Sequence, residues 1–376
     1  MHDKKYFDDL VIPSIKGLTA YIPGKPIEEV ERELGLKNII KLASNENPKG
    51  PSKRVLKAIE MASKDISQYP DGNGFYLKQA IAKKYAIADE MITLGNGSND
   101  VLDIIARAFL GPNREAVFSE HAFVVYSIAT QSVSAVSKVA KACSPDSGQP
   151  YGHDLAAMRC LVNDKTSVVF IANPNNPTGT WLSDEELESF INELPKHVIV
   201  VLDEAYCEYS ETYDDSASVK WVQRYPNLIV TRTFSKAYGL AGLRVGYSIC
   251  HSGIAGLLNR VRQPFNVNSL ALVAAKIALA DDDYLVETRA LNAKGLKQLE
   301  GGFSALNLNY IPSKGNFITV DVGVDAMQIY EKLLHEGVIV RPIPGYDLPN
   351  HLRVSVGTAE QNELLLKALK KVLTCV

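Results

Sequence analysis

The chain has 376 residues, of which 46% are hydrophobic and 22% are charged, values that are ordinary for a globular enzyme and too apolar for a disordered protein. Its 40 Lys and Arg residues against 43 Asp and Glu residues leave a net charge of −3, so no basic excess indicates nucleic-acid binding. The longest apolar run, 270–275, is far too short to span a membrane, and the five cysteines lack the spacing of a zinc or other metal site.

Residues 1–45 are predicted to form an extended N-terminal arm that also supplies part of a smaller domain. The segment YIPGKP near its middle is typical of extended chain. The opening letters, MHDKKYFDDLVIP, contain no apolar stretch of the kind found in a secretory signal. We therefore expect a cytoplasmic enzyme.

Residues 46–283 alternate short apolar runs with helical patterns, which predicts a large domain built on a mostly parallel sheet flanked by helices. The runs are short, rich in Val and Ile, and apolar on both faces, as buried strands require. Strands are expected at 91–94, 116–118, 167–172, 198–202, 228–231 and 245–250. Helices are expected at 100–109 and 184–193, the second opened by a capping box between Ser183 and Glu186.

Residues 284–376 change in character and predict a smaller α+β domain at the C-terminus. Two helical patterns, 284–300 and 361–373, flank short strands at 317–320 and 352–356. The fold class predicted from the whole chain is therefore α/β, with one large and one small domain.

Four of the predicted strands are followed directly by polar or glycine-rich segments. These are GNGSND at 95–100, NPNNPTGT at 173–180, DEAY at 203–206 and RTFSKA at 232–237, with Arg244 a little further on. Ligands bind beyond the carboxyl ends of the strands in open α/β sheets. We therefore expect the four segments to form the wall of one site.

The first and last segments are suited to binding a phosphate. A Gly-Ser-Asn turn at the start of a helix offers free backbone N–H groups and the positive end of the helix dipole. Ser235 could add a hydroxyl donor, and Arg244 could add a bidentate charged contact.

The remaining groups are suited to an aromatic carbonyl cofactor. Asp203 could hold a protonated ring nitrogen, Lys236 could form a Schiff base with an aldehyde, and Tyr206 and Asn176 could donate hydrogen bonds to a phenolate. Phosphate, ring nitrogen, phenolate and aldehyde are the four functional groups through which a protein can bind pyridoxal 5′-phosphate.

Taken singly, each of these features also has an ordinary structural interpretation. The glycine turn lacks the third glycine of a dinucleotide fingerprint, because position 100 is Asp, and NPNNPTGT is a turn sequence in any protein. Asp203 could be a helix cap, Tyr206 a core residue, Lys236 a surface residue and Arg244 part of a structural ion pair. The conjunction favours the cofactor, because unrelated turns would rarely supply all the complementary groups in order.

The segments NPNNPTGT, LDEAYCEY and TRTFSKAYGLAGLRVGY resemble the signatures of fold-type I pyridoxal-phosphate-dependent aminotransferases of class II. Further segments narrow the resemblance to the histidinol-phosphate aminotransferase family and extend it over essentially the whole chain. They are KLASNENPKGPS, QYPDGNGFYLKQAIA, GNGSND, RQPFNVNSLALVAA, SKGNF and the region from VIVRP to LPNHLRVSVGT.

The resemblance implies a role for each matching residue. Lys236 would be the Schiff-base lysine and proton shuttle, Asp203 would pair with the pyridinium nitrogen, and Tyr206 with Asn176 would bind the ring oxygen. Phe123 would stack on the ring. The expected phosphate ligands are Gly97, Ser98, Asn99, Ser235, Arg244 and, across the interface of a homodimer, Tyr69. The expected substrate residues are Tyr21, Arg341 and Arg353, with Arg353 fixing the anionic end.

The resemblance implies amino transfer between glutamate or 2-oxoglutarate and L-histidinol phosphate or imidazole-acetol phosphate, in histidine biosynthesis. An arginine can bind a carboxylate or a phosphate, so phenylalanine, tyrosine and prephenate-type substrates stay open. A decarboxylase of a phosphorylated amino acid and a non-catalytic cofactor-binding regulator are further alternatives. The chain departs from the family pattern at two positions near the expected site. Glu120–Phe123 replaces a common Pro-Thr-aromatic segment, and Asp347 replaces a frequent Gly.

Overall fold

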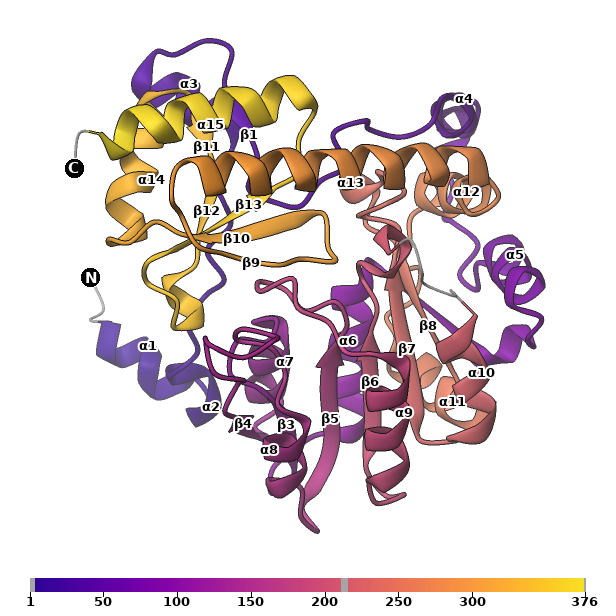
Figure 1. Ribbon diagram of the computed structural model, residues 1–376. Coiled ribbons are helices and arrows are strands. Elements are labelled where there is room, and N and C mark those ends of the chain that lie inside the picture. Colours follow the sequence, from indigo (N-terminus) through magenta and orange to yellow (C-terminus); the bar gives the residue numbers. More distant parts are fainter. Residues whose placement is uncertain (1–3, 211–215, 375–376) are drawn as a thin grey trace.

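The computed structural model describes residues 4–210 and 216–374 and confirms the α/β class (Figure 1). Within these residues it has a seven-stranded sheet, a four-stranded sheet and a two-stranded sheet. The larger sheet has seven strands in the order β2-β8-β7-β6-β5-β3-β4. In that order the strands are β2 (Ile92–Gly95), β8 (Gly246–Cys250), β7 (Leu228–Thr233), β6 (Ile199–Asp203), β5 (Thr166–Ala172), β3 (Glu115–Ser119) and β4 (Val136–Ala140). Only β8 among these strands runs against its neighbours, and the others are parallel.

All six strands predicted for this sheet are present within one or two residues. The seventh, β4, was not predicted from the sequence. It lies at the edge of the sheet beside β3, and four of its five residues are at least partly exposed. Its letters, VSKVA, therefore lack the continuous apolar run of a strand that is buried on both faces.

Helices cover both faces of the seven-stranded sheet, because its central strands send successive apolar side chains to opposite sides. On β5, for example, Val169 packs into one core and Phe170 into the other. The first face is covered by α4 (Lys53–Ala62), α5 (Phe75–Tyr85), α8 (Leu155–Cys160), α9 (Asp184–Glu193), α10 (Ala217–Arg224) and α12 (Ser269–Leu279). The second face is covered by α6 (Ser98–Phe109), α7 (Val125–Ser132) and α11 (Ser252–Val261). The predicted capping box of α9 is present, with Ser183 and Glu186 bonded reciprocally.

The smaller sheet is antiparallel and has its own core. Its order is β12 (Arg341–Pro342), β13 (His351–Ser355), β10 (Phe317–Asp321) and β9 (Tyr310–Ile311). Helices α14 (Ala326–His335) and α15 (Ala359–Leu373) pack against it, and the long helix α13 (Asp282–Ala305) runs between the two parts of the molecule (Figure 1). Short 3₁₀ turns complete the structure: η1 (Ser63–Asp65), η2 (Asp89–Met91), η3 (Cys207–Tyr209), η4 (Ala241–Leu243) and η5 (Pro344–Tyr346).

The prediction that residues 1–45 form an extended arm is wrong in part. Helices α1 (Lys4–Leu10), α2 (Pro13–Lys16) and α3 (Ile27–Leu34) interrupt it. The segment 18–26, which contains YIPGKP, has no regular element. Helix α3 is stabilised by acidic residues in its first turn, which interact favourably with the helix dipole, and by the burial of Val30. It ends at Gly35, which has a φ of 67°.

The end of the arm joins the C-terminal part of the chain. Strand β1 (Ile40–Lys41) pairs in parallel with β11 (Val338–Ile339), and Leu42 packs in the core of the smaller sheet. The assignment of part of the arm to a smaller domain stays a prediction. The boundaries at 45/46 and 283/284 stay predictions; the second falls in the first turn of α13. Within the described residues, no helix combines the length and apolarity needed to cross a membrane.

Candidate active site

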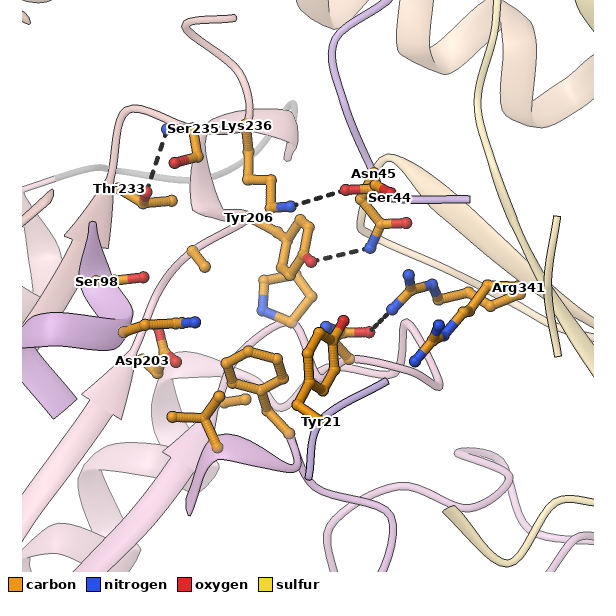
Figure 2. A pocket seen from close by; sticks show the side chains of 18 of the residues that line it. Tyr21, Ser44, Asn45, Ser98, Asp203, Tyr206, Thr233, Ser235, Lys236 and Arg341 are labelled. Carbon is orange, nitrogen blue, oxygen red and sulfur yellow. Dashed lines mark hydrogen bonds between the residues drawn. The ribbon is translucent and has the colours of Figure 1, made fainter. Parts of the chain in front are cut away.

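A cavity of about 410 Å³ lies at the carboxyl edge of the large sheet, where the smaller sheet and the arm meet it (Figure 2). Strand ends β5, β6 and β7 and the start of α6 contribute one wall, and residues from 21–45 and 341–353 contribute the other. Twelve of the fourteen predicted site residues line the cavity: Tyr21, Ser98, Asn99, Phe123, Asn176, Asp203, Tyr206, Ser235, Lys236, Arg244, Arg341 and Arg353. The two exceptions are Gly97 and Tyr69.

Gly97 lies just behind the cavity wall, where the chain turns from β2 into α6. Its φ of 86° and ψ of 165° are accessible to almost no other residue. A Cβ atom at this position would lie 2.6 Å from the guanidinium Nη2 of Arg244. Arg244 reaches the same edge because β8 is antiparallel, so the residues before β8 lie where the other strands end. Its Nη1 donates to Ser235 Oγ at 3.2 Å. The start of α6, Ser235 and Arg244 therefore form one cradle of donors.

Asp203 ends β6, and the residue as a whole is only 4% exposed. Two hydroxyls donate to it: Tyr126 to Oδ2 at 2.9 Å and Thr231 to Oδ1 at 3.1 Å. Burial raises the pKa of Asp203 to about 6, and the two hydroxyl donors oppose that rise. A carboxylate in this environment gains stability from a cationic partner in the cavity.

Lys236 follows β7 and extends into the cavity (Figure 2). Its Nζ donates to the backbone oxygen of Ser44 at 3.1 Å. Burial, followed by the charge of Arg353, lowers the pKa of Lys236 to about 7. A large fraction of the amine is therefore neutral near physiological pH, as a nucleophilic lysine requires.

Tyr206 and Asn176 are held by residues distant in sequence. Asn45 donates through Nδ2 to the Tyr206 hydroxyl at 2.9 Å (Figure 2), which leaves the phenolic proton available for a ligand oxygen. Burial raises the pKa of Tyr206 to about 12, so it stays protonated near neutrality. Arg353 donates through Nη1 to Asn176 Oδ1 at 2.6 Å, and through Nη2 to the backbone oxygen of Ala43 at 2.7 Å.

The outer side of the cavity carries a second arginine and the arm. The guanidinium of Arg341 lies 5.5 Å from the ring centre of Tyr21 and donates to the backbone oxygen of Ile22 at 2.6 Å. Tyr346 lines the cavity beside them, and its backbone oxygen pairs with His121 Nδ1 at 2.6 Å. Asp347 has a φ of 57°. That left-handed conformation explains why glycine would also suit this position.

Tyr69 does not reach the cavity within a single chain. Its side chain is 84% exposed and stacks on Phe265, with the ring centres 4.9 Å apart. A role at the cavity would therefore require a second copy of the chain.

The residues present fit pyridoxal 5′-phosphate. The cradle at α6 can accept a phosphate, because Gly97 leaves room for Arg244 where any side chain would displace it. The buried Asp203 matches a protonated ring nitrogen, the free phenolic proton of Tyr206 matches the ring oxygen, and the amine of Lys236 matches the aldehyde. Among the residues that the structure describes, no group of three His, Cys, Asp or Glu residues could hold a metal ion.

Sequence reasoning missed the residues that hold the predicted ones. These are Tyr126 and Thr231, which donate to Asp203, and Ser44 and Asn45, which contact Lys236 and Tyr206. Only Tyr126 lies close in sequence to a residue predicted for the stacking face, since it follows Phe123 by three residues, at the start of α7. The others depend on contacts between distant segments.

Comparison with known proteins places this arrangement among aminotransferases. The pattern of the family "Aminotransferase class I and II" matches residues 37–369. The chain is 53% identical over 363 residues to histidinol-phosphate aminotransferase 1 of Idiomarina loihiensis, covering 96% of this chain and 97% of that one. It is 55% identical over 366 residues to histidinol-phosphate aminotransferase 2 of Pseudomonas aeruginosa, covering 97% and 98%.

Solved structures give the same picture. The histidinol-phosphate aminotransferase of Sinorhizobium meliloti in complex with pyridoxal 5′-phosphate superimposes with a TM-score of 0.86 at 30% identity, over 97% of this chain and 98% of that one. A double mutant of Thermus thermophilus aspartate aminotransferase shares the fold, with a TM-score of 0.82 at 21% identity, over 97% and 99% of the two chains.

Proposed function

This chain belongs to the class I and II aminotransferase family, and from that premise we propose that it is a pyridoxal-phosphate-dependent histidinol-phosphate aminotransferase. It transfers an amino group from glutamate to imidazole-acetol phosphate, giving 2-oxoglutarate and L-histidinol phosphate. The relatives that are at least half identical over nearly their full length carry that name. The observation that carries the proposal is that Lys236, Asp203 and the start of α6 line one cavity.

The bound cofactor supplies an electron-withdrawing ring and an aldehyde that receives the amino group. Lys236 would hold the cofactor through its amine, at the aldehyde, and the same amine would accept and return the proton of the substrate Cα. Its lowered pKa supports both roles, because a neutral amine is needed to attach and to accept a proton. Asp203 would hold the ring nitrogen in its protonated form, and Phe123, which lines the same cavity, would pack against the ring.

Residues on the other wall bind the substrate. The buried guanidinium of Arg353 faces a cavity that must accept the carboxylate of glutamate and the phosphate of histidinol phosphate in turn, and an arginine fork suits both anions. Arg341 is a second cation at the outer end, and Tyr21 covers it. Closure of the arm over the substrate would exclude water from the reacting atoms.

We also propose that the protein is a cytoplasmic homodimer. An apolar patch, defined by Tyr69, Phe75, Tyr76, Phe265 and Val273, is exposed on the single chain. Patches of this kind mark interaction sites on soluble proteins. The family resemblance implies that Tyr69 would bind the cofactor phosphate of the other subunit across such an interface.

A substrate panel tests the function. Purified holoenzyme is supplied with 2-oxoglutarate and, separately, L-histidinol phosphate, phenylalanine, tyrosine or a prephenate-derived amino acid, and the formation of glutamate is measured. We expect L-histidinol phosphate to give the highest kcat/KM and Lys236→Ala to abolish turnover. A preference for an aromatic amino acid would contradict the substrate assignment. Release of CO₂ without glutamate would indicate a decarboxylase, and cofactor binding without any turnover a regulatory protein.

A further inference from the structure

Tyr126 lies behind the cavity wall and contacts two residues that face the cofactor. Its hydroxyl donates to Oδ2 of Asp203 at 2.9 Å, and its ring meets the ring of Phe123 edge-on, with centres 5.9 Å apart and planes at 90°. Tyr126 itself is fully buried and does not line the cavity. It can therefore act on the cofactor only through its neighbours.

The position of Tyr126 is fixed from the sheet side. Its ring stacks on Phe170 of β5, with centres 4.8 Å apart and planes only 7° from parallel. Phe170 is also fully buried, in the core between the sheet and helices α6, α7 and α11. Because packed aromatic rings at this depth have little freedom to move, the hydroxyl of Tyr126 is held at a defined place relative to the end of β6.

The hydrogen bonds around Asp203 leave Tyr126 a distinct role. Thr231, on the neighbouring strand β7, donates to Oδ1, so each carboxylate oxygen has its own buried hydroxyl donor. The pKa of Tyr126 is raised well above its ordinary value, mainly by burial, so the phenol stays protonated and stays a donor. Hydrogen bonds that favour the charged form oppose the protonation of a buried carboxylate.

The other charged or titratable groups near Asp203 do not replace that donor. Glu204, the next residue along the chain, raises the pKa of Asp203 and is itself bonded to the buried Arg232 at 2.7 Å. Tyr206 and Lys236 line the same cavity, but the side-chain donors on the Asp203 carboxylate are Tyr126 and Thr231. The Tyr206 hydroxyl accepts from Asn45, and the amine of Lys236 donates to Ser44.

We infer that Tyr126 is a positioning residue for the cofactor, whose hydroxyl keeps Asp203 ionised and aimed while its ring supports Phe123. The inference rests on the proposed function, since both neighbours act on pyridoxal 5′-phosphate. Two parts of the side chain have different roles. The hydroxyl acts through Asp203 on the ring nitrogen of the cofactor, and the aromatic ring acts through Phe123 on the face of the cofactor ring.

Tyr126→Phe tests the hydroxyl, because it removes one oxygen and keeps the aromatic ring. The readout is the affinity of the apoprotein for pyridoxal 5′-phosphate, measured by quenching of intrinsic fluorescence between pH 5 and 8. We expect affinity near pH 7 to fall about tenfold, as for the loss of a hydrogen bond to a charged group. We also expect the acid limb of the pH profile to move to higher pH, because Asp203 loses a donor that favours its charged form.

Two further variants and one control sharpen the result. Thr231→Val removes the other donor and should move the acid limb in the same direction. Tyr126→Leu also removes the aromatic ring that supports Phe123. It should weaken cofactor binding further at every pH, while the acid limb of its pH profile should lie at the same pH as in Tyr126→Phe. Tyr225→Phe is the matched control, because Tyr225 also donates to a carboxylate, that of Glu188 at 3.3 Å, and does not line the cavity.

The outcomes separate this inference from the proposed function. If the parent protein binds no pyridoxal 5′-phosphate, the proposed function is wrong. If the parent binds it and folded Tyr126→Phe keeps the same affinity within twofold and the same acid limb, the positioning role is wrong. Should Tyr126→Phe fail to fold, an unchanged acid limb in Thr231→Val would overturn the claim that buried hydroxyls keep Asp203 ionised.

Discussion

Lys236 and Asp203 face the same cavity, and burial acts on both by disfavouring the charged form. Burial lowers the pKa of the lysine to about 7 and raises that of the aspartate to about 6. The pKa values of the two groups therefore lie close together, near neutral to slightly acidic pH. Amino transfer requires a neutral amine and an ionised carboxylate, and the fraction of molecules with both increases as the pH rises through 6 and 7.

The pH dependence of cofactor attachment tests this pair at the level of single residues. Attachment needs the neutral amine, so its rate should fall about tenfold per pH unit below about pH 7 and level off above it. The measurement is the rise in visible absorbance when apoprotein and pyridoxal 5′-phosphate are mixed between pH 5.5 and 9. A rate that kept rising through pH 9 would show that the lysine retains its ordinary pKa.

The variant Arg353→Gln extends the same measurement. The charge of Arg353 is the second cause of the lowered pKa of Lys236, so its removal should move the inflection to higher pH. Arg341→Gln is the matched control, since Arg341 lines the cavity but is not among the groups that shift Lys236. Equal shifts in the two variants would contradict the assigned cause.

At the scale of elements, the turn from β2 into α6 depends on one backbone conformation. Gly97 adopts a φ of 86° and a ψ of 165°, and the first residue of α6, Ser98, faces the cavity. Asp100 holds the turn from within, because its Oδ2 accepts a hydrogen bond from the backbone N–H of Asn96 at 2.8 Å. Asp100, at the position where a dinucleotide-binding fingerprint has its third glycine, therefore stabilises the turn.

Gly97→Ala should weaken the binding of pyridoxal 5′-phosphate much more than that of pyridoxal, which lacks the phosphate. The added Cβ would meet Arg244 at 2.6 Å and displace the guanidinium, and the backbone conformation itself costs about 1–3 kcal/mol for a residue other than glycine. Affinities for the two ligands and the thermal midpoint check both effects.

Gly111→Ala is the control for that substitution. Gly111 has no atom within 4 Å of the added Cβ and no positive φ. It should leave both affinities and the thermal midpoint close to those of the parent. An equal loss of affinity for pyridoxal and its phosphate in Gly97→Ala would show that the turn does not bind the phosphate.

At the scale of the whole molecule, the site is built between the two sheets. Asn176, on the large sheet side, is held by Arg353 of β13, and Tyr206 is held by Asn45 at the end of the arm. The arm, the large sheet and the C-terminal sheet must therefore all be in place before the cavity exists. Tyr69 is the one predicted site residue whose contribution requires an additional chain.

The homodimer is tested by Tyr76→Glu, which places a charge in the apolar patch. Tyr76 is 69% exposed on the single chain, so the substitution should leave the fold intact, shift sedimentation from dimer towards monomer, and weaken cofactor binding. Leu364→Glu, on α15 and 45% exposed, is the control and should stay dimeric. A parent protein that sediments as a monomer, or a Tyr76→Glu variant that stays dimeric, would remove the patch as the interface.

The sequence by itself determined six of the seven strands of the large sheet and most of the residues at its carboxyl edge. Strands such as 167–172 and 228–231 are visible because burial on both faces demands continuous apolar runs, and the residues after them face the cavity because parallel strands end at one edge. The family resemblance then added Phe123, Arg353 and the arm to the predicted site residues.

Only the tertiary structure decided how these groups are held. The hydroxyl of Tyr126 on Asp203, the amide of Asn45 on Tyr206 and the carbonyl of Ser44 on Lys236 join segments 77, 161 and 192 residues apart. Local sequence patterns record which face of a strand or helix is buried. They do not record which distant side chain lies opposite, because that depends on how the sheets, the helices and the arm pack together in space.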